Sequence, residues 1–153
     1  MNKYEALLSE ADEKGIKVKE LDLKSSDGRL KGNKIGIRKD LSTAIDKACV
    51  LAEELGHYHT TVGDITDLSD PQNRKQERQA RMWGYNKLIG LTGIIKAFQS
   101  GCHSRHETAE YLDVTEEFLQ ECIDCYRDKY GVCATIDKYT VFFIPNLAVM
   151  EEV

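Results

Sequence analysis

Residues 51–61 read LAEELGHYHTT and lie at the centre of an amphipathic pattern in this chain of 153 residues. Apolar side chains recur at helical spacing around this stretch, at Ala44, Ala48, Leu51, Leu55 and Tyr58. Side chains that recur at positions i, i+3, i+4 and i+7 share one face of an α-helix. The pattern therefore predicts a helix over residues 43–60, and Thr43 and Asp46 form a capping-box pattern at its start.

A second face of this helix carries Glu53 and His57, which lie four residues apart and so point the same way. Zinc accepts both imidazole nitrogen and carboxylate oxygen, so the two side chains can bind one ion. A carboxylate in place of a second histidine makes the site harder and more anionic, which favours manganese or iron or weakens zinc. Glu54 is offset by about 100° along the helix. It lies one turn before His57, where it can take a proton from a metal-activated water.

A metal site needs a third ligand from another part of the chain. Glu77 is the best candidate, because it lies on the next predicted helix at a distance that suits a helix–loop–helix return. Asp64, Asp67 and His59 are poorer choices, and on a continuous helix His59 diverges from His57. The alternative interpretation is that EELGH is an exposed acidic helix face with one histidine.

The composition is that of a soluble protein, with 41% hydrophobic and 31% charged residues. A net charge of −5 and a pI near 5.4 argue against a general binder of nucleic acid or anionic membranes. No apolar run approaches the roughly 18–20 residues that span a bilayer. The first residues lack the apolar core of a signal peptide. We therefore expect a cytoplasmic protein without membrane contact, whose five cysteines remain thiols.

The regions around the central helix predict a small sheet and more helices. An amphipathic helix is expected over residues 2–14 and a strand over residues 16–23. Residues 25–41, rich in glycine, suit turns and short strands of a small antiparallel sheet. A helix capped by Asn73 follows over residues 73–91, and then a short helix over 92–101.

The last third of the chain predicts two closely joined helices and a β-hairpin. Ser104 and Thr115 are the expected N-caps, and the short link between the helices suggests a helix-turn-helix. The hairpin over residues 132–144 has Asp137 and Lys138 at its tip. The second helix is strongly acidic, so DNA binding is disfavoured against protein contact or completion of the core.

The cysteines also allow two interpretations. Cys122 and Cys125 have the spacing of a zinc-binding pair, with Cys102 before them and Cys133 after them. The pair falls in the middle of a predicted helix, whereas structural zinc pairs usually lie on turns. We therefore interpret these cysteines as packed thiols that act as small hydrophobic side chains.

Four segments together resemble the ImmA/IrrE family of metallopeptidase-like proteins, in particular its phage-borne branch. They are KGNKIGIRKDL, KACVLAEELGHYHTTVGDI, NRKQERQARMWGYNKLIG and ETAEYLDVTEEFLQ. The resemblance implies that His57 and Glu77 are metal ligands and that Glu54 is the catalytic base. Glu53 stands where the family usually has the first histidine of H-E-x-x-H. The implied cofactor is zinc, with manganese, iron or no metal as alternatives.

We therefore expect an α+β fold: a mainly helical, zincin-like core with a small sheet, followed by a helix-turn-helix and a hairpin. The predicted domains are a metallopeptidase-like domain over residues 1–91 and a C-terminal region over 92–153 packed on it. The expected function is a metal-dependent, endopeptidase-like regulator of a prophage or mobile element. It would cleave a protein partner such as a phage-type repressor. The alternatives are an inactive peptidase fold that binds a regulatory protein and, less favoured, a DNA-binding regulator.

Overall fold

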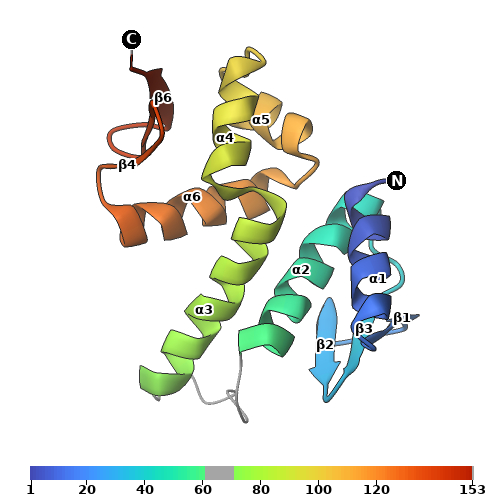
Figure 1. Cartoon of the computed structure of the whole chain (residues 1–153). Coiled ribbons are helices and arrows are strands. Elements are labelled where there is room, and N and C mark those ends of the chain that lie inside the picture. Colours follow the sequence, from blue (N-terminus) through green and yellow to red (C-terminus); the bar gives the residue numbers. More distant parts are fainter. Residues whose placement is uncertain (61–70, 153) are drawn as a thin grey trace. The chain divides into compact units, whose positions relative to one another are not determined.

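The computed structural model describes residues 1–60 and 71–152 and confirms an α+β fold of helices with two small sheets (Figure 1). The chain divides into two compact units, Met1–Gly84 and Tyr85–Val153. This division lies inside a helix, whereas we expected a domain boundary after residue 91.

The first unit contains the elements that carry the predicted site. They are α1 (Lys3–Glu13), β1 (Lys17–Leu21), β2 (Gly28–Lys31), β3 (Lys34–Arg38), α2 (Ala44–Thr60) and most of α3 (Pro71–Leu88). Asn2 caps α1 by accepting a hydrogen bond from the Glu5 amide at 2.8 Å, as its sequence pattern predicts. The third helix begins at Pro71, not after Asn73, in keeping with the preference of proline for the first position of a helix.

The three strands of the first unit form a sheet in the order β1-β3-β2. The pair β2–β3 is antiparallel as expected, but β1 runs parallel to β3. Ile35 and Ile37 of β3 are 2% and 0% exposed. Both α1 and α2 contact the sheet and each other, and Figure 1 shows them side by side next to it. One face of the sheet therefore packs on these helices, and α2 forms part of the core.

The second unit consists of helices followed by a C-terminal sheet. Its elements are α4 (Gly90–Gln99), α5 (Arg105–Leu112), α6 (Glu116–Tyr130), β4 (Cys133–Ile136), β5 (Tyr139–Phe142) and β6 (Ala148–Glu151). Ile136 pairs with Tyr139, so Asp137 and Lys138 form the tip of the predicted hairpin. The strand β6, which we did not predict, adds to β5 in an antiparallel pair.

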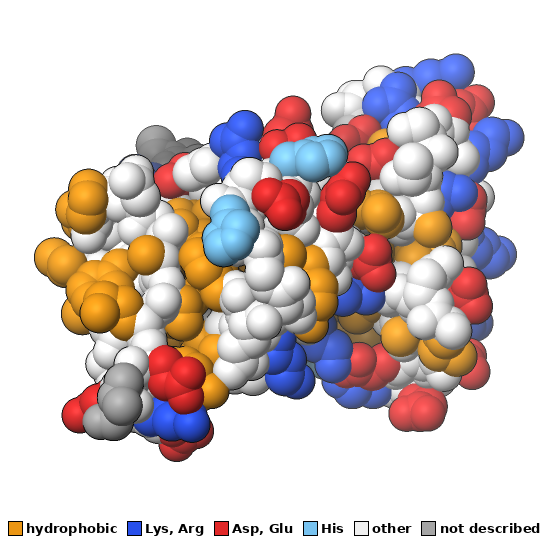
Figure 2. Space-filling model, turned by 90° about the horizontal axis from the view of Figure 1, so that it is seen from above, with side chains coloured by type: hydrophobic (Ala, Val, Ile, Leu, Met, Phe, Trp, Pro, Cys, Tyr) orange, Lys and Arg blue, Asp and Glu red, His pale blue; other side chains and the backbone are white. Residues whose placement is uncertain are grey.

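The core of the second unit contains the predicted buried thiol. Cys122 is fully buried beside Tyr126 and Leu119, which are also 0% exposed. The C-terminal sheet is less covered, because Val132, Met150 and Ile144 near it are exposed. Figure 2 shows hydrophobic side chains gathered at the left of the view. None of the described helices is long and apolar enough to cross a membrane.

Candidate functional site

Small residues bring α2 and α3 into close contact. A Cβ atom added at Gly56 of α2 would overlap the carbonyl oxygen of Ala80 in α3. One turn away on each helix, a Cβ added at Gly84 would lie 3.2 Å from the carbonyl oxygen of Ala52. Both Ala52 and Ala80 are fully buried. Backbones can approach this closely only where side chains are absent or small, so the contact fixes which residues of the two helices face each other.

The close contact places His57 opposite Glu77. The Nε2 atom of His57 lies 3.5 Å from Oε2 of Glu77, and each side chain is 21% exposed. The second oxygen of Glu77 accepts a hydrogen bond from Nε of Arg81, one turn later on α3, at 3.1 Å. The structure therefore brings together two of the three predicted ligands, and Arg81 holds the carboxylate of one of them in place.

Glu54 lies between the helix pair and the edge strand β2. A Cβ added at Gly28, the first residue of β2, would lie 2.9 Å from Cγ of Glu54 and 2.8 Å from Cγ1 of Val50. Glycine at position 28 thus allows β2 to pack against this turn of α2. Burial, together with the negative charges of Glu53 and Glu77, raises the pKa of Glu54 to about 7. A carboxyl group with such a pKa can exchange a proton near neutral pH, as a general base must.

The donor set can be compared with the needs of a zinc ion. Zinc bound at about 2.0–2.1 Å by nitrogen and oxygen in a tetrahedral site holds those two atoms roughly 3.3 Å apart. The 3.5 Å separation between His57 and Glu77 suits two such ligands. Among the residues that the structure describes, no three His, Cys, Asp or Glu side chains lie close enough together to hold an ion. Glu53 interacts electrostatically with Glu54, but it does not complete a ligand set with His57 and Glu77.

The remaining ligand candidates divide into two groups. The ring of His59 stacks on Trp83, with centroids 4.8 Å apart. Asp64 and Asp67 lie outside the described residues. Neither the stacking of His59 nor the Gly56–Ala80 contact was predicted from the sequence. The sequence does contain one signal for the helix contact, because small residues lie four apart on each helix: Ala52 and Gly56 on α2, and Ala80 and Gly84 on α3.

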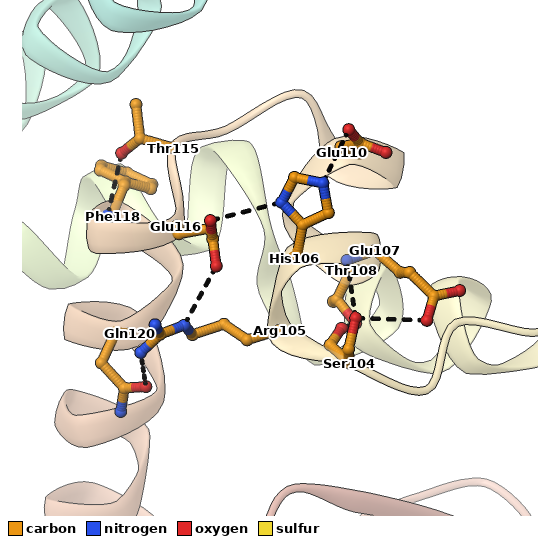
Figure 3. Close-up of polar contacts among 10 residues, drawn as sticks. All are labelled: Ser104, Arg105, His106, Glu107, Thr108, Glu110, Thr115, Glu116, Phe118 and Gln120. Atoms are coloured by element: carbon orange, nitrogen blue, oxygen red, sulfur yellow. Dashed lines mark hydrogen bonds and ion pairs between the residues drawn. The ribbon is translucent and has the colours of Figure 1, made fainter.

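Polar side chains join α5 to α6 in the second unit (Figure 3). His106 lies between two carboxylates, 3.0 Å from Glu110 and 3.3 Å from Glu116. Arg105 donates hydrogen bonds to Glu116 at 3.4 Å and to Gln120 at 3.1 Å. Ser104 and Thr115 cap the two helices, as their sequence patterns predict. The contacts of Arg105 and His106 with Glu116 and Gln120 hold the start of α6 against α5.

The cysteines of the second unit provide no described metal site. All five cysteines of the chain are free thiols. Cys122 is fully buried, and burial raises the pKa of its thiol far above the ordinary value. A neutral buried thiol packs as a small hydrophobic side chain, so the sequence interpretation is confirmed for the buried Cys102 and Cys122. It is wrong for Cys133, which is exposed, and Cys125 is half-buried.

Comparison with known families identifies the class of protein to which this fold and site belong. The family model Peptidase_M78, described as the IrrE N-terminal-like domain, matches residues 11–123. The chain therefore belongs to this family and has a peptidase-family fold. The matched segment contains α2 and α3 with Glu54, His57 and Glu77, and it continues into α6. Searches of curated proteins and of solved structures gave no significant match.

Proposed function

We propose that this protein is a metal-dependent, endopeptidase-like regulator that cleaves a protein partner such as a phage-type repressor. The observation that supports the proposal most directly is the 3.5 Å contact between His57 and Glu77 beside Glu54, in a chain of the Peptidase_M78 family. Imidazole and carboxylate at this distance are a natural pair of zinc ligands. Glu53, four residues before His57 on α2, is the ligand that we propose to complete the site when an ion binds, and manganese or iron is an alternative to zinc.

Each of these residues has a separate role in the proposed reaction. His57 and Glu77 would hold the ion, whose contribution is to lower the pKa of a bound water and to polarise the peptide carbonyl. Glu54 accepts a proton from the attacking water and passes it to the leaving amine. Its partial burial under β2 limits the water around the carboxylate. Arg81 is a positioning residue, because it holds the Glu77 oxygen that does not face His57.

Metal content and cleavage can be measured on the same protein. We expect the chain purified without chelator to contain close to one equivalent of metal by inductively coupled plasma mass spectrometry. His57→Ala and Glu77→Gln should lose it. Added to a bacterial lysate, the wild type should generate new peptide N-termini that Glu54→Gln, with its metal retained, does not. Unchanged cleavage by Glu54→Gln would contradict the assigned role of Glu54.

A second candidate function rests on a different observation. The described residues do not include a complete set of three ligands, which favours a peptidase fold that binds a regulatory protein without cleaving it. This candidate predicts no tightly bound metal and the same N-termini with wild type and Glu54→Gln. The two measurements above therefore distinguish the candidates.

A further inference from the structure

The outer face of the first sheet carries only one sign of charge. Residues paired across neighbouring strands point to the same side of a sheet, and successive residues of a strand alternate sides. Lys17, Lys34 and Lys31 are paired in one row across β1, β3 and β2. Lys19 and Arg29 flank Gly36 in the next row on the same face. Because Ile35 and Ile37 occupy the alternate positions in the core, these five cations face away from α1 and α2.

These five cations surround a hollow. A cavity of about 280 Å³ is lined by Leu21, Ile35 and Gly36 together with the five cations Lys17, Lys19, Arg29, Lys31 and Lys34. All five basic side chains are exposed. Within the described part of the chain, none of them forms an ion pair with a carboxylate. By contrast, Arg38 and Lys47 nearby are both paired with acids.

The floor of the hollow is apolar. Leu21 is 42% exposed and lies over the buried Gly36 of the central strand, so the leucine side chain borders the hollow. A Cβ added at Gly36 would lie 2.8 Å from Cδ1 of Leu21, which shows how closely the leucine borders this space. The face therefore offers a place for one apolar group surrounded by positive charge.

We propose that the outer face of this sheet binds a short, extended, acidic segment of a partner protein, with one apolar side chain in the hollow. Alternate side chains of an extended segment are about 6.8 Å apart, which is also the spacing between the two cation rows along the strands. With the apolar side chain in the hollow, in the row of Lys19 and Arg29, a carboxylate two residues away along the segment can then meet the row of Lys17, Lys34 and Lys31. This binding does not depend on peptidase activity, because it uses none of the residues of the candidate site.

The charge distribution favours an acidic protein segment over nucleic acid. The whole chain has a net charge of −5, so the residues outside this face are more strongly negative still. A long polyanion would experience that repulsion, whereas a short segment senses only charges within about 8 Å at physiological salt. The hollow is lined by no aromatic side chain. Aromatic side chains are the usual stacking surface for bases of single strands.

Binding can be tested with defined probes and the full-length chain. The probe is a short fluorescein-labelled peptide in which glutamates flank a central leucine, and fluorescence anisotropy reports binding. We expect affinity to fall about tenfold in the triple variant Lys19→Ser/Arg29→Ser/Lys31→Ser, because each exposed ion pair contributes a factor of a few. A scrambled peptide with the leucine at one end should also bind more weakly. Added salt should weaken the specific binding.

A matched triple variant tests whether the loss of three positive charges outside this face also weakens binding. Lys75→Ser/Lys96→Ser/Lys129→Ser removes three exposed lysines outside this face and should bind the peptide as the wild type does. If the sheet variant does not fold, protection of Lys17, Lys19, Lys31 and Lys34 from acetylation in the wild-type complex tests the same surface. Equal peptide binding by both triple variants, or absence of such protection, would overturn the proposal. So would tighter binding of single-stranded DNA that is lost only in the sheet variant.

Discussion

At the scale of single residues, the candidate site combines groups that a stable fold would not place together. Glu54 is half-buried near the carboxylates of Glu53 and Glu77, and no described cation is shown to neutralise it. Burial and like charge both disfavour its ionised form. Clusters that reduce stability are typical of functional sites, where selection for chemistry opposes selection for stability. Removing the negative charge of Glu54 should therefore stabilise the fold.

We expect Glu54→Gln to raise the stability of the metal-free protein by about 1–2 kcal/mol, since the amide keeps the shape and removes a partly desolvated charge. Thermal unfolding at pH 8 in the presence of a chelator measures the change. Glu13→Gln, at an exposed position near the end of α1, is the matched control and should change stability by less than about 0.5 kcal/mol. A Glu54→Gln variant less stable than the wild type would show that the carboxylate has a stabilising partner.

At the scale of secondary-structure elements, local signals were sufficient for most helices but not for the sheets. The caps Asn2, Ser104 and Thr115 each form the hydrogen bond that their sequence pattern predicts. The direction of β1 could not be predicted, because parallel and antiparallel pairing bury the same alternating residues. Strand β6 has two half-buried and two exposed residues, so it lacks the alternation that would have marked it.

The candidate site, too, could be predicted within one helix but not between two helices. The helical spacing of Glu53, Glu54 and His57 follows from the sequence alone, because all three lie on α2. The contact with Glu77 depends on how α2 and α3 approach each other, and the helical pattern assigns no role to glycine at position 56. Contacts of this kind arise from backbone packing. Small residues four apart on a helix indicate a surface for close packing, but they do not say which residues of another helix it meets.

The close contact between α2 and α3 predicts that Gly56→Ala disrupts the candidate site, although Gly56 itself has no role in binding or catalysis. The new methyl group would overlap the backbone of Ala80, which cannot rotate away, so α2 and α3 must separate. We expect a loss of about 2–3 kcal/mol in the free energy of unfolding, measured by urea denaturation, despite the better helix propensity of alanine. Gly93→Ala in α4 is the control, because it meets mainly the mobile end of Leu112. Equal stability of the two variants would contradict the close packing of α2 and α3.

The α5–α6 contact predicts a dependence on pH. A hydrogen bond to Glu116 and the charge of Glu110 raise the pKa of His106, and the hydrogen bond to His106 lowers the pKa of Glu116. The raised histidine pKa stabilises the folded state below about pH 6.5, an effect lost as pH rises through the folded pKa. The lowered glutamate pKa stabilises it above about pH 4.5, an effect lost on further acidification. NMR titration should show a raised pKa for His106 that returns toward 6.5 in Glu116→Gln.

At the scale of the whole molecule, the family match and the compact units divide the chain differently. The match runs from residue 11 to residue 123, whereas the units meet between Gly84 and Tyr85 inside α3. The candidate ligands His57 and Glu77 both belong to the first unit. The second unit has its own core around Leu119 and Tyr126. Ligand binding at the candidate site should therefore be detected mainly within the first unit.

Hydrogen exchange with and without zinc tests this expectation in the intact chain. A ligand that binds only the folded state slows the opening of the elements that hold it, and the effect grows with the logarithm of its concentration. We expect zinc to slow exchange of the amides in α2 at least tenfold when it is present well above its dissociation constant. The amides of α6 should change little. His57→Ala should remove the protection of α2, since it deletes one of the two facing donors. Protection that persists in His57→Ala, or that is equally strong in α6, would place the bound ion elsewhere and would leave the contact between His57 and Glu77 as an ordinary ion pair of the helix interface.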